Sequence, residues 1–313
     1  NICDPRPRYV SDQRGRKVAP MQQAGRLGVR LLTCVLLGCA SPASRAEPPP
    51  APPAIEPKLA STELARDLID GRVGVLFHVG RFRFHPAGGA IGALGRWGDI
   101  VKALGLDPLA DVERAFVTSF QASDLNTVNV IELNASDERV RAGFRALGGS
   151  ATSATFGLQN GPEVFVALVG PHRLVSGPPR IASKLWVLAE TESLPQPQAK
   201  EAARFFAFEP YATLGSPPSW PATLLLAQAE IEIVRGGGAT VRFEAMSASS
   251  ARASADASTL TAEARRLLTV DIGLFDLQVI EPPVFNSNGR RVVMETQLLP
   301  SDVDWLIRFS GGG

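Results

Sequence analysis

The chain has 313 residues, with 32 lysines and arginines against 31 aspartates and glutamates, a formal net charge of +1 at pH 7. The first 38 residues hold seven basic and two acidic side chains, which leaves 25 basic and 29 acidic residues behind them, a net charge of about −4. That balance excludes the basic surface that nucleic-acid binding requires. About 250 residues then remain for a core, enough for one large domain or two smaller ones.

Residues 21–38 have the order of a secretory signal peptide, in which Arg26 and Arg30 precede a short apolar run that ends at Gly38. A permanent membrane-spanning helix needs about 20 apolar residues, and this run is much shorter. We therefore expect a signal peptide that is removed by cleavage.

Residues 1–20 precede Met21, the only methionine that could start such a leader. They carry five basic side chains and no apolar periodicity. We interpret them as a mis-assigned N-terminal extension. The alternative is a leader with an unusually long basic region, and it leaves the rest of the interpretation unchanged.

The four residues Leu36, Leu37, Gly38 and Cys39 resemble the lipobox of bacterial lipoproteins, where a small residue before the cysteine allows cleavage by the lipoprotein signal peptidase. The resemblance implies that Cys39 becomes the first residue of the mature chain and carries acyl chains. Two or more such chains anchor a protein stably to a membrane. No aspartate follows Cys39 to favour retention in the inner membrane, so we expect the periplasmic face of the outer membrane.

The cysteines are Cys3, Cys34 and Cys39, so only Cys39 remains after cleavage, with its sulfur blocked by lipid. The body would then have no disulfide, thiolate ligand or cysteine nucleophile, and its stability would depend on its core. Prolines and alanines dominate residues 39–60, a composition that favours extended polyproline II. We expect this segment to be a tether between the lipidated cysteine and the body.

Residues 61–193 are predicted to form a first α+β lobe. Its expected elements are a helix from Ser61, a strand Val73–Val79 with a bulge at Gly80, a helix Pro86–Leu104, strands Val112–Phe120 and Thr127–Leu133, a helix capped by Ser136, and strands Val164–Val169 and Arg173–Ser176. The order strand, helix, strand, strand, helix, strand is that of a ferredoxin-like antiparallel unit.

Residues 198–313 are predicted to form a second lobe of hairpins and helices, after a Pro-rich break. Its expected elements are a hairpin Ala229–Val234 and Thr240–Met246, a helix Ala248–Leu268, a hairpin Val279–Phe285 and Arg291–Leu298 with its turn at Asn286–Gly289, and a helix from Ser301. From the element order alone, this lobe could be a divergent repeat of the first.

A catalytic metal site needs about three protein ligands, and the chain has three histidines, His78, His85 and His172. We interpret them as isolated histidines near strand ends, with a shared metal site as the weaker alternative. The sequence contains no Gly-x-Ser-x-Gly, Ser-x-x-Lys or His-Glu-x-x-His motif. We therefore assign no catalytic residue and no cofactor, and we favour a protein that is not an enzyme.

The body also resembles the uncharacterised lipoproteins that are common in predatory soil bacteria. The resemblance rests on the whole plan of lipobox, tether and α+β body, and on the motif Gly105-Leu-Asp-Pro-Leu-Ala-Asp-Val-Glu-Arg114. It implies a location and a fold, and it implies no activity.

Our leading hypothesis is a membrane-anchored envelope lipoprotein whose body is a non-enzymatic binding or scaffolding module with an envelope protein as its partner. The first alternative is a hydrolase or lipid-handling enzyme whose active site is dispersed along the sequence. The second is a small-ligand carrier, which would need a sizeable apolar cavity between the lobes.

Overall fold

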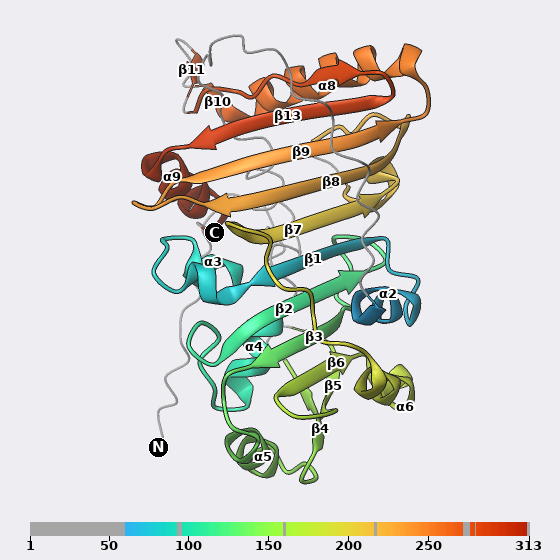
Figure 1. Cartoon of the computed structure of the whole chain (residues 1–313), viewed down its shortest axis with the longest axis vertical. Coiled ribbons are helices and arrows are strands. Elements are labelled where there is room, and N and C mark those ends of the chain that lie inside the picture. The colour runs from blue at the N-terminus through green and yellow to red at the C-terminus, as the bar shows by residue number, and fades with distance from the viewer. Residues whose placement is uncertain are drawn as a thin grey trace, which may run out of the picture.

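The fold is taken from a computed structural model that describes residues 60–311 except 93–95, 159–160, 216–217, 272–275 and 279. The predicted signal peptide, Cys39 and the tether lie outside these residues. The described strands form one sheet of 11 antiparallel strands, with the order β12-β13-β9-β8-β7-β1-β2-β3-β6-β5-β4, and a separate pair, β10-β11 (Figure 1). The α+β character expected from the sequence is confirmed.

The strands of the first half are β1 (Val73–His78), β2 (Val112–Ser119), β3 (Val128–Leu133), β4 (Ser153–Gly157), β5 (Glu163–Leu168) and β6 (Arg173–Gly177). Those of the second half are β7 (Glu201–Phe208), β8 (Leu224–Ile233), β9 (Ala239–Ser247), β10 (Thr269–Asp271), β11 (Asp276–Gln278), β12 (Asn286–Asn288) and β13 (Arg291–Leu298).

The α-helices are α2 (Ala60–Asp67), α3 (Gly88–Ile91), α4 (Trp97–Ala103), α5 (Asp137–Ala146), α6 (Ala182–Leu185), α7 (Pro210–Thr213), α8 (Ser250–Leu268) and α9 (Pro300–Gly311). Short 3₁₀ helices are η1 (Val79–Phe82), η3 (Pro179–Ile181) and η4 (Trp186–Glu190). Among these described helices, none combines the length and the apolar character that crossing a membrane would require.

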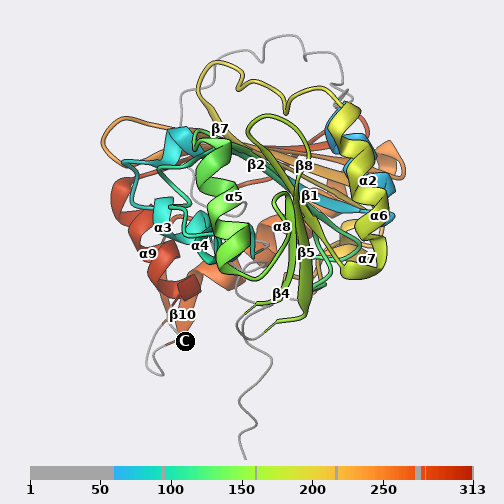
Figure 2. The ribbon, with the colours of Figure 1, turned by 90° about the horizontal axis from the view of Figure 1, so that it is seen from below.

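One face of the sheet carries a core that runs through both halves. Val75 of β1, Phe205 of β7 and Phe243 of β9 belong to it, and α4, α5, α8 and α9 pack against it. The other face has a smaller core that is confined to the first half, where α2 and α6 cover Leu76 and Phe116. Seen from below, α2 and α6 lie on one side of the sheet, and α3, α4, α5 and α9 lie on the other (Figure 2).

The two halves are joined by the antiparallel pairing of β1 with β7, in which Gly74 lies opposite Phe206. A Cβ atom at Gly74 would lie 2.5 Å from the Phe206 ring, so the missing side chain makes room for that ring. Phe206 stacks on Phe116 of β2, with ring centroids 6.3 Å apart. An aromatic side chain of the second half thus packs against the smaller core of the first half.

Both halves follow the same path. The strand order β1-β2-β3-β6-β5 of the first half has its counterpart in β7-β8-β9-β13-β12 of the second. A helix follows the third strand in each half: Ser136 caps α5 by accepting from the Arg139 N–H, and Ser249 caps α8 by accepting from the Arg252 N–H. The second strand of each half begins with a register shift, at β2 and at β8.

The ferredoxin-like arrangement is not confirmed. In that split unit the strands on either side of a helix are not neighbours, whereas β1 and β2, on either side of α3 and α4, pair directly. The predicted bulge at Gly80 is wrong, because the chain leaves the sheet in η1 and buries Val79 and Phe82. The predicted helix Pro86–Leu104 is interrupted and forms α3 and α4.

The last predicted hairpin is shifted along the chain. Residues 280–285 form no strand, and Asn286–Asn288 form the short strand β12 instead of the turn. The chain reverses at Gly289, whose φ of +60° suits a residue without a side chain. The hairpin β8-β9 and the helices α8 and α9 confirm the predicted elements of the second lobe.

We expect Gly74→Val to lower the free energy of unfolding by about 1–3 kcal/mol, because the added side chain must displace the Phe206 ring from the junction of the two halves. Urea denaturation measures the change. Gly89→Ala is the control, since a Cβ there would have no neighbour within 4 Å. Equal denaturation midpoints for Gly74→Val and the unmodified chain would contradict the role of Gly74.

Candidate functional site

A row of charged and polar side chains crosses the first half of the sheet on the face opposite the continuous core. In the first half it consists of directly opposed neighbours on four adjacent strands: Arg173 on β6, Glu132 on β3, Arg114 on β2 and His78 on β1. All four residues are buried. Burial of charge is costly unless every charge has a partner, so this row must be internally paired.

The pairing is made by Glu132 and two arginines. The Glu132 carboxylate lies 2.6 Å from Arg114 Nη2 and 3.5 Å from Arg173 Nη2. The same groups hold the segment 191–200 that joins the two halves: Arg114 donates to the Leu194 carbonyl at 2.7 Å, and the Leu194 N–H donates to Glu132 at 2.6 Å. Figure 1 shows this segment crossing in front of β1 and β2. The buried charges therefore serve to fix the connection between the halves.

His78 meets Glu201 of β7 where the halves join. His78 is 3% exposed and Glu201 is 1% exposed, and His78 Nε2 lies 3.6 Å from Glu201 Oε1. The other carboxylate oxygen accepts from Arg204 Nη2 at 2.8 Å and from the Gln198 N–H at 3.1 Å. Burial acts to raise the pKa of Glu201, but His78, the Gln198 N–H and the Arg204 charge outweigh it, so the pKa lies below its usual value.

A separate row with alternating charge crosses the second half. It is offset by two residues from the first, since Arg204 of β7 lies opposite Leu76 of β1. Arg204, Glu230, Arg242 and Glu295 lie directly opposite one another on β7, β8, β9 and β13. Arg242 lies 2.6 Å from Glu232 and 3.5 Å from Glu295. Burial and the Glu201 charge raise the pKa of Glu230 above its usual value, although Arg204 and Arg242 act in the other direction.

We call the surface around this row of the second half the open face. It comprises three cross-strand rows on β7, β8, β9 and β13: Arg204, Glu230, Arg242 and Glu295; Phe206, Gln228, Glu244 and Val293; Phe208, Leu226, Met246 and Arg291. All of these side chains are partly or fully exposed. The helix α8 lies behind the sheet in the view of Figure 1, whereas α2 reaches the β7 edge of the open face, where Arg66 lies over the Phe208 ring and Phe206 packs against the smaller core.

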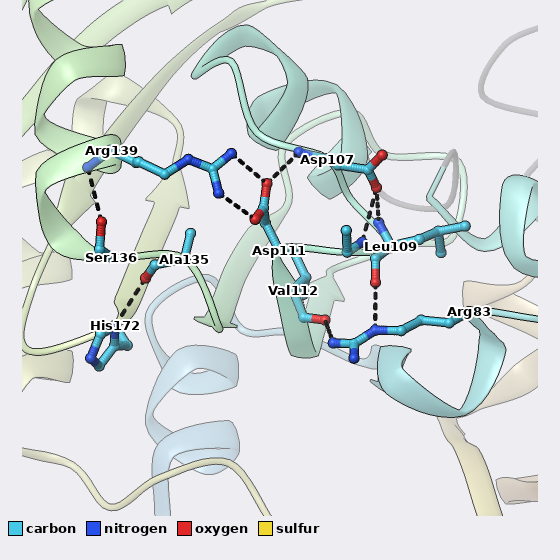
Figure 3. Close-up of polar contacts among 10 residues, drawn as sticks. Arg83, Asp107, Leu109, Asp111, Val112, Ala135, Ser136, Arg139 and His172 are labelled. Carbon is cyan, nitrogen blue, oxygen red and sulfur yellow. Dashed lines mark hydrogen bonds and ion pairs between the residues drawn. The ribbon is translucent and has the colours of Figure 1, made fainter.

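The motif Gly105–Arg114 forms a cluster of hydrogen bonds on the other side of the sheet. The Asp111 carboxylate accepts two hydrogen bonds from Arg139 of α5, at 2.7 and 3.0 Å, and one from the Asp107 N–H at 2.8 Å (Figure 3). Burial would raise the pKa of Asp111, but these hydrogen bonds outweigh it and lower the pKa. Every bond described here ties a turn or a helix to the start of β2, so the motif has a structural role.

The histidines of the weak metal hypothesis are held at separate places. His78 lies at the junction, His85 accepts from the Ala87 N–H at 3.1 Å, and the His172 ring contacts the Ala135 carbonyl at 3.0 Å (Figure 3). Among the described residues, no group of three or more histidine, cysteine, aspartate or glutamate side chains could hold a metal ion. The structure thus does not bring the three histidines together.

A hollow beside Arg96, lined also by Leu125, Leu158 and Glu163, has a volume of about 10 Å³. That is room for roughly one water molecule. It is far smaller than the pockets of several hundred Å³ that hold small molecules.

No protein-family model, curated protein or solved structure matches this chain. Its function therefore has to be argued from the geometry of the described residues.

The sequence analysis did not identify the open face, although the sequence carries its signal. On β8, Glu230 and Glu232 alternate with buried Ile231, and on β9, Arg242 and Glu244 alternate with buried Phe243. A period of two with charge on one side predicts a sheet with one apolar and one polar face. Only the strand order shows that the charged positions of four strands lie side by side.

We expect Glu201→Gln to lower the free energy of unfolding at pH 7 by about 1–3 kcal/mol, because Arg204 and His78 lose a buried charged partner. The folded-state pKa of Glu201 is lowered, so its contribution is complete above the unfolded value of about 4.5 and disappears as the pH falls through the folded value. Denaturation at pH 7 and at pH 3 measures the difference, which should be smaller at pH 3.

The control for this experiment is Glu295→Gln, whose side chain is 60% exposed and which should change the stability by less than about 0.5 kcal/mol. A Glu201→Gln effect of the same size at both pH values would show that the ionised carboxylate is not what stabilises the junction.

Proposed function

We propose that this protein is an envelope lipoprotein, anchored by lipid on Cys39, whose body is a non-enzymatic binding module that contacts another envelope protein through the open face. The observation that carries the binding role is the open face itself. It is a four-stranded surface of mixed charge that α2 reaches at Phe208 on the β7 edge, next to a first half whose corresponding face is covered by a second core.

The chemistry of the open face supports a protein partner. Phe206, Phe208 and Met246 are exposed in part on it, and its cations are arginines. Aromatic residues, methionine and arginine are the types enriched in protein interfaces, whereas lysine is depleted. An antiparallel sheet can face water on one side, so exposure alone would not carry the argument. The combination of apolar and arginine side chains in adjacent rows does.

The two alternative functions have less support. A hydrolase with a dispersed site would need a histidine next to a serine and a carboxylate, and the contacts described above for His78, His85 and His172 do not form such a set. A small-ligand carrier would need a cavity much larger than the hollow beside Arg96. We therefore keep the binding module as the proposed function.

We also infer that the two lobes are divergent copies of one unit. Besides the shared strand order, the Asn134 N–H donates to the Asp111 carbonyl at 2.8 Å, and the Ala248 N–H donates to the Thr223 carbonyl at 2.8 Å. In each lobe the residue before the second strand also makes a side-chain hydrogen bond to the helix that follows the third strand. Asp111 bonds to Arg139 of α5, and Thr223 bonds to Asp256 of α8. If the first half of related sequences could not be aligned with their second half, the support for a common origin of the two lobes would be removed.

The lipid anchor is tested by Cys39→Ser. Without the thiol no diacylglyceryl group can be attached, so we expect the protein to move from the membrane fraction to the soluble fraction and to lose labelling by radioactive palmitate. Cys34→Ser is the matched control, and it should leave both properties unchanged. Undiminished palmitate labelling of the Cys39→Ser protein would overturn the anchor.

The binding role of the open face is tested by Arg242→Glu in cells that are treated with a crosslinker. We expect the crosslinked products of the protein to fall at least fivefold, since the change reverses a charge in the centre of the open face. Arg145→Glu is the control, because that exposed arginine lies on α5, on the other side of the sheet. Identical crosslinked products for both variants would contradict binding through the open face.

A further inference from the structure

The open face is complementary to itself. Its first row runs Arg204, Glu230, Arg242, Glu295, with charges that alternate from β7 to β13. A two-fold axis parallel to the strands, midway between β8 and β9, would bring β7 opposite β13 and β8 opposite β9 of a second copy. Arg204 then faces Glu295 of the second copy, and Glu230 faces its Arg242. Every position of this row meets the opposite charge.

The other two rows match under the same operation. In the second row Phe206 faces Val293 of the second copy, and Gln228 can donate to its Glu244. In the third row Leu226 faces Met246, an apolar pair, and Phe208, whose ring already has Arg66 of its own chain over it, faces Arg291. Apolar side chains thus meet apolar side chains in two of these pairs, Glu244 meets a hydrogen-bond donor, and Arg291 meets the Phe208 ring.

We propose that the open face binds the open face of a second copy of this chain, as a face-to-face dimer with a two-fold axis between β8 and β9. This proposal rests on the proposed function, in which the open face is the binding surface, and it names the partner. Two packed sheets lie about 10 Å apart and cross at about 30°. Glu230 and Arg242 of the second copy lie nearest the two-fold axis, so they are the closest of the facing pairs. Their long side chains can span the distance between the two sheets.

The size of the surface sets the strength of the dimer. Four strands at about 4.8 Å spacing and about eight residues at about 3.3 Å rise give a surface of roughly 20 by 26 Å, or about 500 Å² for each copy. Stable interfaces bury about 800 Å² on each side. We therefore expect a weak and reversible dimer, favoured when the copies are held on the same membrane.

The fold of the first half supports this choice of partner. There, α2, α6 and residues 191–200 of the chain itself cover the same face of the sheet. Among the described residues, the smaller core on this face includes no residue of β8, β9 or β13. In the dimer the second copy covers these strands, and the carboxylate of Glu230, whose pKa is raised, gains an arginine.

The test uses two full-length copies with different C-terminal tags, expressed together, extracted in mild detergent and isolated through one tag. Arg242→Glu in both copies places the introduced carboxylate against that of Glu230, and Glu230→Arg in both copies places two arginines together. We expect each of these pairs to co-isolate at no more than one tenth of the unmodified pair. A mixed pair, with Arg242→Glu in one copy and Glu230→Arg in the other, restores both contacts and should recover at least half.

The mixed pair separates the dimer from effects within one chain, because each copy in it still carries its own unfavourable substitution. Resistance to proteolysis confirms that each variant is folded, and Arg145→Glu in both copies should co-isolate like the unmodified pair. Equal recovery in all pairs, or no recovery of the mixed pair, would overturn the dimer.

A failed dimer can be told apart from a failed binding role. If unmodified copies do not co-isolate while Arg242→Glu still removes crosslinks to a different protein, the dimer is wrong and the proposed function stands. If neither co-isolation nor crosslinking depends on Arg242, both are wrong.

Discussion

The pairing of β1 with β7 is the constraint on which the rest of the structure depends. It joins the two halves of the chain, each with its own meander of strands, into one sheet of 11 strands. The pairing requires Gly74 to make room for Phe206, and it places His78 beside Glu201 at the point where the chain enters the second half. Because both halves share this sheet, one continuous core covers one of its faces.

The same pairing leaves the charged positions of the two halves in two rows that are offset by two residues, since Arg204 lies opposite Leu76. Where residues 191–200 cover the row of the first half, its charges are buried and need partners, and Glu132 pairs there with Arg114 and Arg173. Where the cover ends, the pairs are exposed and contribute little to stability. Evolution is therefore free to use the exposed part for recognition, since changing it costs the fold little.

Sequence patterns predicted elements well where the signal is local. The Ser136 cap, the hairpin β8-β9 and the long helix α8 each depend on residues within a few positions of one another. The errors came from segments whose path depends on distant contacts. Val79 continues the alternation of β1, yet the chain leaves the sheet there because the side chains of Val79 and Phe82 are buried in the core beside it.

The sequence by itself determined the α+β class, the division of charge between the first 38 residues and the rest, and the alternating polar pattern on β8 and β9. It also carried the resemblance to a lipobox at Cys39, which lies outside the described residues. Only the tertiary structure decided that Arg204, Glu230, Arg242 and Glu295 form one row. Strand order and register are set by contacts between residues far apart in the chain, and a pattern with a period of two specifies a face but not a neighbour.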